Sequence, residues 1–187
     1  MNNLSKWLRY AFWPCLLVMT VWAWSVEASF IFHLVVVVLI VTSILLAWWQ
    51  NRWLMGSISL VFIAMTGFFA YLQLTGFDVI STLLVFFLVI VVSTLSIFVA
   101  FDTYSIEVKE PKMTVYWVGM IFMIVQLFWL LTQLIADPVI RAALVAGLFY
   151  VMFAVITLHA WDKLEQRNFR MYLLSLTIFF IVFAKLL

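Results

Sequence analysis

Charged residues are scarce in this sequence. Only 10% of the 187 residues are charged, whereas a soluble domain of this size carries about a quarter. Apolar residues make up 68% of the chain, and its mean hydropathy is +1.25. A chain this apolar has too little polar surface to cover itself in water, but a lipid bilayer removes that requirement. The composition therefore excludes an ordinary soluble domain and predicts an integral membrane protein with the lipid bilayer as its main partner.

Cysteine, proline and glycine are also rare, with one, three and five residues. A single cysteine, Cys15, excludes an intramolecular disulfide. The chain has no internal repeat, no Gly/Ser linker, and no polar stretch long enough for a second domain. We therefore expect residues 1–187 to form a single integral membrane domain with no extramembrane domain.

Motifs that bind metals, nucleotides or substrates are missing. Nothing resembles a His-Glu-x-x-His metal site, a Gly-x-Ser-x-Gly nucleophile turn or a phosphate-binding glycine loop. The net charge of +2 is too small to indicate a nucleic-acid partner. No group of residues indicates a particular functional family. The sequence predicts no catalytic residue, no metal site and no cofactor, and it does not favour an enzyme.

Seven apolar segments are long enough, or nearly so, to cross a bilayer as helices. A crossing needs roughly 20 residues. The segments are approximately Trp7–Trp24, Phe30–Trp49, Trp53–Thr75, Val79–Phe101, Val115–Ala136, Val139–Trp161 and Met171–Leu187. The predicted fold is therefore an all-α, polytopic transmembrane bundle of seven spans.

Lysine and arginine are concentrated in alternate loops of this arrangement. Eight of them fall on the side of the N-terminus, namely Lys6, Arg9, Arg52, Lys109, Lys112, Lys163, Arg167 and Arg170. The opposite side has only Arg141 and Lys185. Because basic loops are retained in the cytoplasm, the N-terminus is predicted to be cytoplasmic and the protein to lie in the plasma membrane.

The N-terminal segment has a second interpretation. Lys6 and Arg9, the apolar run after them, and Val26-Glu27-Ala28 are also the pattern of a signal peptide and its cleavage site. The apolar run is long for a signal peptide and contains several bulky tryptophans. Removal of residues 1–28 would leave six spans with the same loop orientation, so this alternative stays open.

Charged side chains are absent from the middle of every predicted span. Proton relays, ion sites and retinal Schiff bases place ionisable groups there, so the pattern argues against ion-coupled pumps and retinal proteins. The two histidines, His33 and His159, fall near opposite membrane surfaces. They are therefore too far apart to hold one haem between them, and both are interpreted as interfacial or packed residues.

Uncharged polar side chains within the spans are the candidate site residues. Gln126 lies near the middle of the fifth segment, and Gln133 follows two helical turns later with Trp129 between them. Since an amide in hydrocarbon needs a partner, this face, which also carries Gly119, is predicted to point into the bundle. The interpretation is hydrogen bonding between helices; the alternative is a polar pocket or a permeation path.

Small residues recur at helical spacing in three segments and predict close helix contacts. One stripe joins Ala143, Gly147 and Ala154 with Tyr150, which is the fourth candidate binding residue. The other two stripes are Gly56, Ile63, Gly67 and Ala70, and Ser93, Ser96 and Ala100. These faces are predicted to pack within the bundle or against other membrane subunits.

Three functions from different classes remain after these exclusions. The first is a non-enzymatic structural, accessory or assembly component of the membrane. The second is a permease or carrier for a small neutral or lipophilic solute. The third is a lipid-modifying enzyme at the cytoplasmic face, which would hold a divalent metal on the loop carboxylates Asp102, Glu107, Glu110, Asp162 and Glu165.

Overall fold

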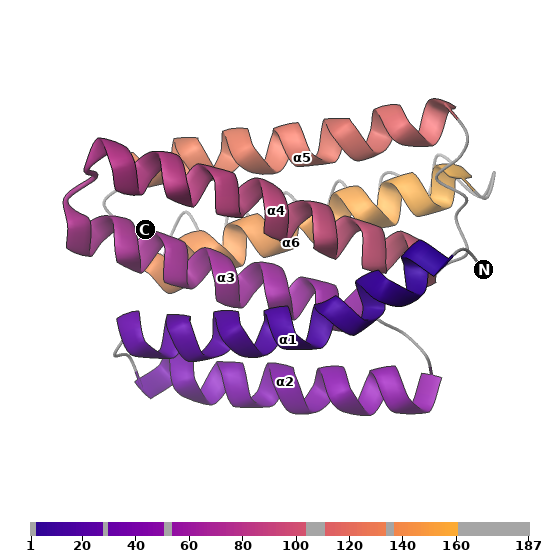
Figure 1. The fold of residues 1–187 in the computed structure, drawn as a ribbon, viewed down its shortest axis with the longest axis horizontal. Helices are drawn as coiled ribbons and strands as arrows, with labels where there is room; N and C mark the ends of the chain where they lie inside the picture. Colours follow the sequence, from indigo (N-terminus) through magenta and orange to yellow (C-terminus); the bar gives the residue numbers. More distant parts are fainter. Residues whose placement is uncertain (1–2, 28–29, 51–53, 104–110, 134–136, 161–187) are drawn as a thin grey trace.

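The computed structural model describes residues 3–27, 30–50, 54–103, 111–133 and 137–160 (Figure 1). These residues form six helices: α1 (Asn3–Val26), α2 (Phe30–Gln50), α3 (Leu54–Thr75), α4 (Val79–Thr103), α5 (Pro111–Thr132) and α6 (Pro138–Ala160). Over this part of the chain the all-α prediction is confirmed, and the first six predicted segments agree with the helix bounds to within a few residues. The seventh segment, Met171–Leu187, lies outside the described residues.

Four of the described helices contain stretches long and apolar enough to cross a membrane. They are Leu54–Thr75, Val79–Phe101, Thr114–Thr132 and Pro138–Thr157. In α1 and α2 the apolar stretches that fall on described side chains are Tyr10–Val26 and Phe32–Leu45. The helices are therefore compatible with a membrane protein, as the composition predicts.

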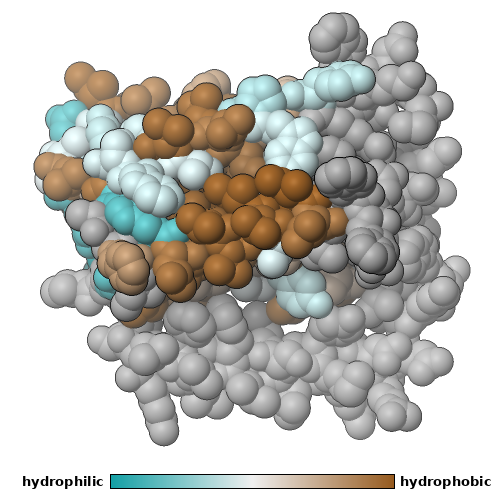
Figure 2. Space-filling model, turned by 90° about the horizontal axis from the view of Figure 1, so that it is seen from below, coloured by the Kyte–Doolittle hydropathy of each residue, from teal (hydrophilic) through white to brown (hydrophobic). Residues whose placement is uncertain are grey.

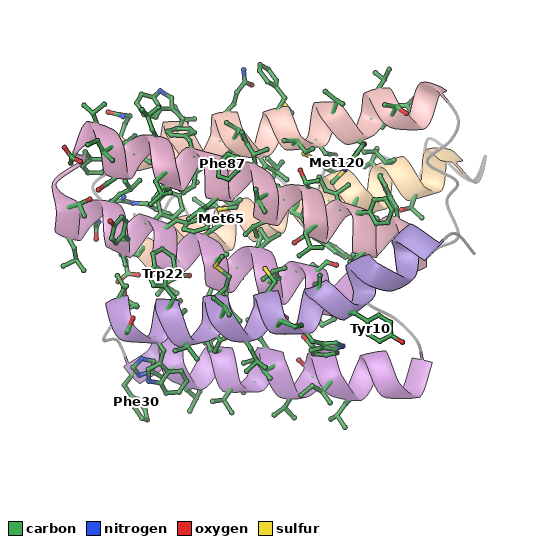
Figure 3. All side chains as sticks on the ribbon, in the orientation of Figure 1. Tyr10, Trp22, Phe30, Met65, Phe87 and Met120 are labelled. Carbon is green, nitrogen blue, oxygen red and sulfur yellow. The ribbon has the colours of Figure 1, made fainter. Side chains whose placement is uncertain are left out.

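Helix α3 lies at the centre of the bundle, in contact with α1, α2, α4 and α6. Its residues are buried along nearly its whole length, so it is apolar or small on every side. Figure 1 shows α2 and α5 at opposite edges, with α5 resting on α4 and α6. Figure 3 shows Met65 of α3 inside the bundle, whereas Tyr10 and Phe30 point outward.

The side of the molecule formed by α2 is apolar where it faces outward. Figure 2 views the bundle from this side and shows a broad hydrophobic surface on the described residues. Its exposed side chains in α2 include Leu34, Val37, Val38, Val41, Ile44 and Leu45. Contact between such an apolar surface and lipid chains is favourable, whereas its contact with water is unfavourable. The surface is therefore compatible with a membrane protein.

Two predicted small-residue stripes do lie at helix contacts. Gly56, Ile63, Gly67 and Ala70 are all buried in α3, and Ser93, Ser96 and Ala100 are all buried in α4. A Cβ atom built on Gly67 would lie 2.9 Å from Cζ3 of Trp22 and 3.1 Å from Cβ of Ala23. The missing side chain at Gly67 therefore allows α1 to approach α3 closely.

Helices α3 and α4 are joined by a tight turn. Gly76 and Phe77 both have left-handed backbone conformations, with φ of 63° and 60°. The N–H of Phe77 donates to the carbonyl of Leu72 at 3.2 Å, which ends α3 in the manner of a Schellman motif. Left-handed φ is unusual for a bulky residue, so the turn fixes Phe77 in a strained conformation at the start of α4.

Candidate functional site

The outer face of α5 carries the predicted polar residues. Gln126 and Gln133 are exposed, Trp129 is 50% exposed, and apart from the adjoining backbone of α5 no atom lies within 4 Å of the position that a Cβ of Gly119 would take. The prediction that this face points into the bundle is therefore wrong. The opposite face of α5 is the buried one, and it is lined by Met120, Ile124, Phe128 and Leu131.

The direction of α5 follows from the areas that its two faces bury. Phe128 and Leu131 bring large apolar surfaces into the core, whereas Gln126 would bring an amide that needs a hydrogen-bond partner. Among the described residues, Gln126 makes no side-chain hydrogen bond. The amide is therefore left at the surface of a helix that is compatible with a membrane span.

Two of the four candidate residues, Trp129 and Gln133, line a groove between the start of α4 and the end of α5. The groove has a volume of about 500 Å³ and is lined by Phe77, Val79, Thr82, Leu83, Phe86, Trp129, Thr132 and Gln133. The Gln133 amide donates to Oγ1 of Thr132 at 3.3 Å, and Thr132 donates to the carbonyl of Trp129 at 2.6 Å. The groove is thus mostly apolar, with a polar edge at the end of α5.

Tyr150, the fourth candidate, lies elsewhere. It is 44% exposed on α6, and Ala143, Gly147 and Ala154 beside it are half-buried. The buried face of α6 is adjacent to this stripe on the helix surface. It consists of Ala142, Val145, Ala146, Phe149 and Phe153. The larger aromatic side chains decide which face of α6 is buried, so the small-residue stripe does not mark the closest contact within the described bundle.

An aromatic cluster forms the inner wall of the groove. Phe86 packs against Trp129 with ring centroids 5.4 Å apart and against Phe128 at 5.8 Å. Phe128 stacks on Phe69 of α3 at 4.5 Å. These rings connect α3, α4 and α5 and close the groove toward the core, since Phe69 and Phe128 are fully buried.

Arg141 lies over the Phe69 ring of this cluster. Its side chain is only 3% exposed, and its guanidinium carbon lies 5.6 Å from the centroid of the Phe69 ring. Nε and Nη1 are buried without a hydrogen-bond partner. In the sequence Arg141 counts only as a topology charge, although its place in the first turn of α6 is itself a signal, because a cation there opposes the helix dipole.

A second set of buried polar groups lies in α3, α4 and α5. The hydroxyls of Ser57, Ser93 and Ser96 and the indole N–H of Trp117 are buried without a partner. By contrast, the hydroxyls of Ser59 and Ser43 bond to each other at 2.8 Å and link α3 to α2. These uncharged groups offer hydrogen bonds but no acid, base or nucleophile pair.

No cluster of three His, Cys, Asp or Glu side chains that could hold a metal ion occurs among the described residues. His33 is half-buried; its Nε2 lies 3.0 Å from the carbonyl oxygen of Glu27, and its ring stacks on Trp24 at 4.1 Å. The side chains of the loop carboxylates Asp102, Glu107, Glu110, Asp162 and Glu165, and that of His159, lie outside the described residues.

The chain matches no protein family, no curated protein and no solved structure.

Proposed function

We propose that the chain is a multi-pass protein of the plasma membrane, with seven spans and a cytoplasmic N-terminus, that acts as a non-enzymatic accessory or assembly component. Its partner would be a transmembrane helix of another membrane protein, bound along the outer face of α5. The exposed amide of Gln126 is the observation that supports this proposal.

The chemistry of Gln126 defines the partner. The amide has two donor hydrogens and an acceptor oxygen, and a lipid acyl chain can form a hydrogen bond with none of them. A hydroxyl or amide side chain on a neighbouring helix would do so, with a contribution of roughly 0.6–2 kcal/mol. Gly119, two turns away on the same face, leaves space for that helix to approach closely. Among the four candidate spans α5 is the least buried, so its outer face is available for such a contact.

The alternative of a carrier has less support. The carrier alternative places the amides of α5 on a polar path inside the bundle, but the inward face of α5 presents Met120, Ile124 and Phe128 instead. Gln126 lies on the opposite face, and Phe69 and Phe128 close the groove toward the core. A lipid-modifying enzyme would depend on loop carboxylates outside the described residues, so no observed geometry favours it.

A photo-cross-linker at Phe122 tests the proposed contact in native membranes. Phe122 is exposed on α5 one turn before Gln126, and we expect one discrete cross-linked product there. Gln126→Leu should reduce its yield about threefold to tenfold, and Gly119→Leu should reduce it further, because the partner would lose a hydrogen bond or its close approach. A cross-linker at exposed Leu34 of α2 should give no such product.

The outcome also distinguishes the kind of partner. If two differently tagged copies of the chain cross-link to each other, the partner is a second copy and the proposal of a separate partner protein is wrong. If only lipid is labelled at Phe122, the accessory role itself is contradicted.

The proposed topology has its own test, based on the distribution of lysine and arginine. A reporter active only outside the cytoplasm should be active when fused after Leu187 and inactive when inserted within Asp102–Thr114. The reverse pattern would contradict the orientation. Activity at both positions would instead contradict the number of spans.

A further inference from the structure

Arg141 is the one described side chain that carries a charge into the buried interior. Its Nε and Nη1 are buried without a hydrogen-bond partner, and Asp137, in the turn just before it, interacts with its charge electrostatically. A buried guanidinium whose N–H groups lack acceptors is strongly unfavourable. Proteins retain such a group when another group accepts those hydrogen bonds.

The carboxylate that interacts electrostatically with Arg141, Asp137, also accepts a backbone hydrogen bond. Oδ1 of Asp137 accepts the N–H of Val139 at 2.8 Å, and the carbonyl of Asp137 accepts the N–H of Arg141 at 3.1 Å. Asp137 therefore caps the start of α6 and does not bond to the guanidinium. Asp78, which caps α4, likewise accepts the N–H of Ser81 at 3.3 Å.

The surroundings of Arg141 fit an anion. Phe69 lies against the guanidinium and favours the cation through its ring face. The N–H groups of arginine form a planar set that matches the oxygens of a phosphate. Arg141 is also the fourth residue of α6, so it lies within about one helical turn of the bundle end, the level at which lipid phosphates are found.

We propose that Arg141 is a phosphate-binding site at the start of α6, which takes either a phospholipid headgroup or free phosphate. The bound oxygens accept the hydrogen bonds of Nε and Nη1, which no described residue accepts. This site is independent of the outer face of α5, because Gln126 and Gly119 take no part in it.

The test uses the purified full chain in a neutral detergent and follows its thermal unfolding midpoint. Two probes are added separately: phosphatidylglycerol, compared with diacylglycerol, and inorganic phosphate, compared with chloride at equal ionic strength. At a hundredfold excess over the Kd, the effective probe should raise the midpoint by about 5 °C or more. A response to lipid alone identifies a headgroup, and a response to inorganic phosphate identifies free phosphate; either supports the site.

Three variants make the test specific. Arg141→Met should abolish the shift, and its midpoint without ligand should equal or exceed that of the parent, because a buried guanidinium whose N–H groups lack acceptors is removed. Arg141→Lys should fold and keep only part of the shift, since lysine lacks the planar donor set. Lys112→Gln removes a positive charge from the first turn of α5 and should respond like the parent.

Two results would overturn the proposal. One is a parent protein whose midpoint responds to neither probe. The other is a shift of equal size in the parent and in Arg141→Met, or, if that variant does not fold, in the parent and in Arg141→Lys.

Discussion

Replacing Gly67 by leucine is expected to lower the free energy of unfolding in detergent by about 3 kcal/mol or more. A Cβ at this position already meets the Trp22 ring at 2.9–3.0 Å, and leucine adds three further carbons. Trp22 is held by Phe68 and Tyr71, at 5.3 and 5.7 Å between ring centroids, so it cannot turn aside easily. Helices α1 and α3 would have to separate. The thermal unfolding midpoint should fall by about 6 °C or more.

Gly119→Leu is the matched control for this prediction. The substitution is the same and the position is also helical, but apart from the adjoining helix backbone no atom lies within 4 Å of the added Cβ. Leucine is also the better helix former, so the midpoint should stay level or rise slightly. If Gly67→Leu melts like the parent, α1 does not pack against α3 at Gly67.

Replacing Phe128 by alanine is expected to remove about 3–5 kcal/mol from the free energy of unfolding. Phe128 is fully buried and joins α5 to Phe69 of α3 and Phe86 of α4. Its loss leaves a cavity behind the groove wall and removes both ring contacts. Thermal unfolding in detergent measures the change, and the groove residue Trp129 should show altered fluorescence because it packs on Phe86.

Phe122→Ala separates this effect from a general loss of apolar surface. Phe122 lies on the same helix but is 60% exposed, so its removal leaves no cavity in the core. The thermal unfolding midpoint of the Phe122→Ala variant should stay near that of the parent protein. Equal destabilisation by the two substitutions would contradict the assignment of Phe128 to the buried face of α5.

Helix positions were predictable because their signals are local. Apolar stretches bounded by short polar breaks, such as Asp137-Pro138 and Gly76-Phe77-Asp78, already indicate where α6 and α4 begin. Asp and Pro are favoured at helix starts, and glycine at helix ends, whatever the rest of the fold does. The observed bounds therefore lie within a few residues of the prediction.

Which face of each helix points into the bundle was harder to predict, as α5 shows. A helix in water reveals its buried face by its apolar stripe, but in a bilayer both faces are apolar. The position of Gln126 was therefore the main basis for predicting which face of α5 is buried. Because amides are unfavourable in hydrocarbon, Gln126 was predicted to point into the bundle, whereas it is exposed. The competing term was the packing of Met120, Ile124 and Phe128 against their neighbours, which no local pattern reveals.

The sequence by itself determined the helical class, the helix bounds and the compatibility with a membrane, because composition and capping act residue by residue. Tertiary structure decided that α3 is central, that Gln126 points outward, and that Arg141 is buried behind Phe69. The physical reason is that these features depend on which side chains from different helices fill the same space. Close packing between helices is stabilising only where their surfaces are complementary in shape. That complementarity depends on side chains from two helices together, so the sequence of one helix does not reveal it.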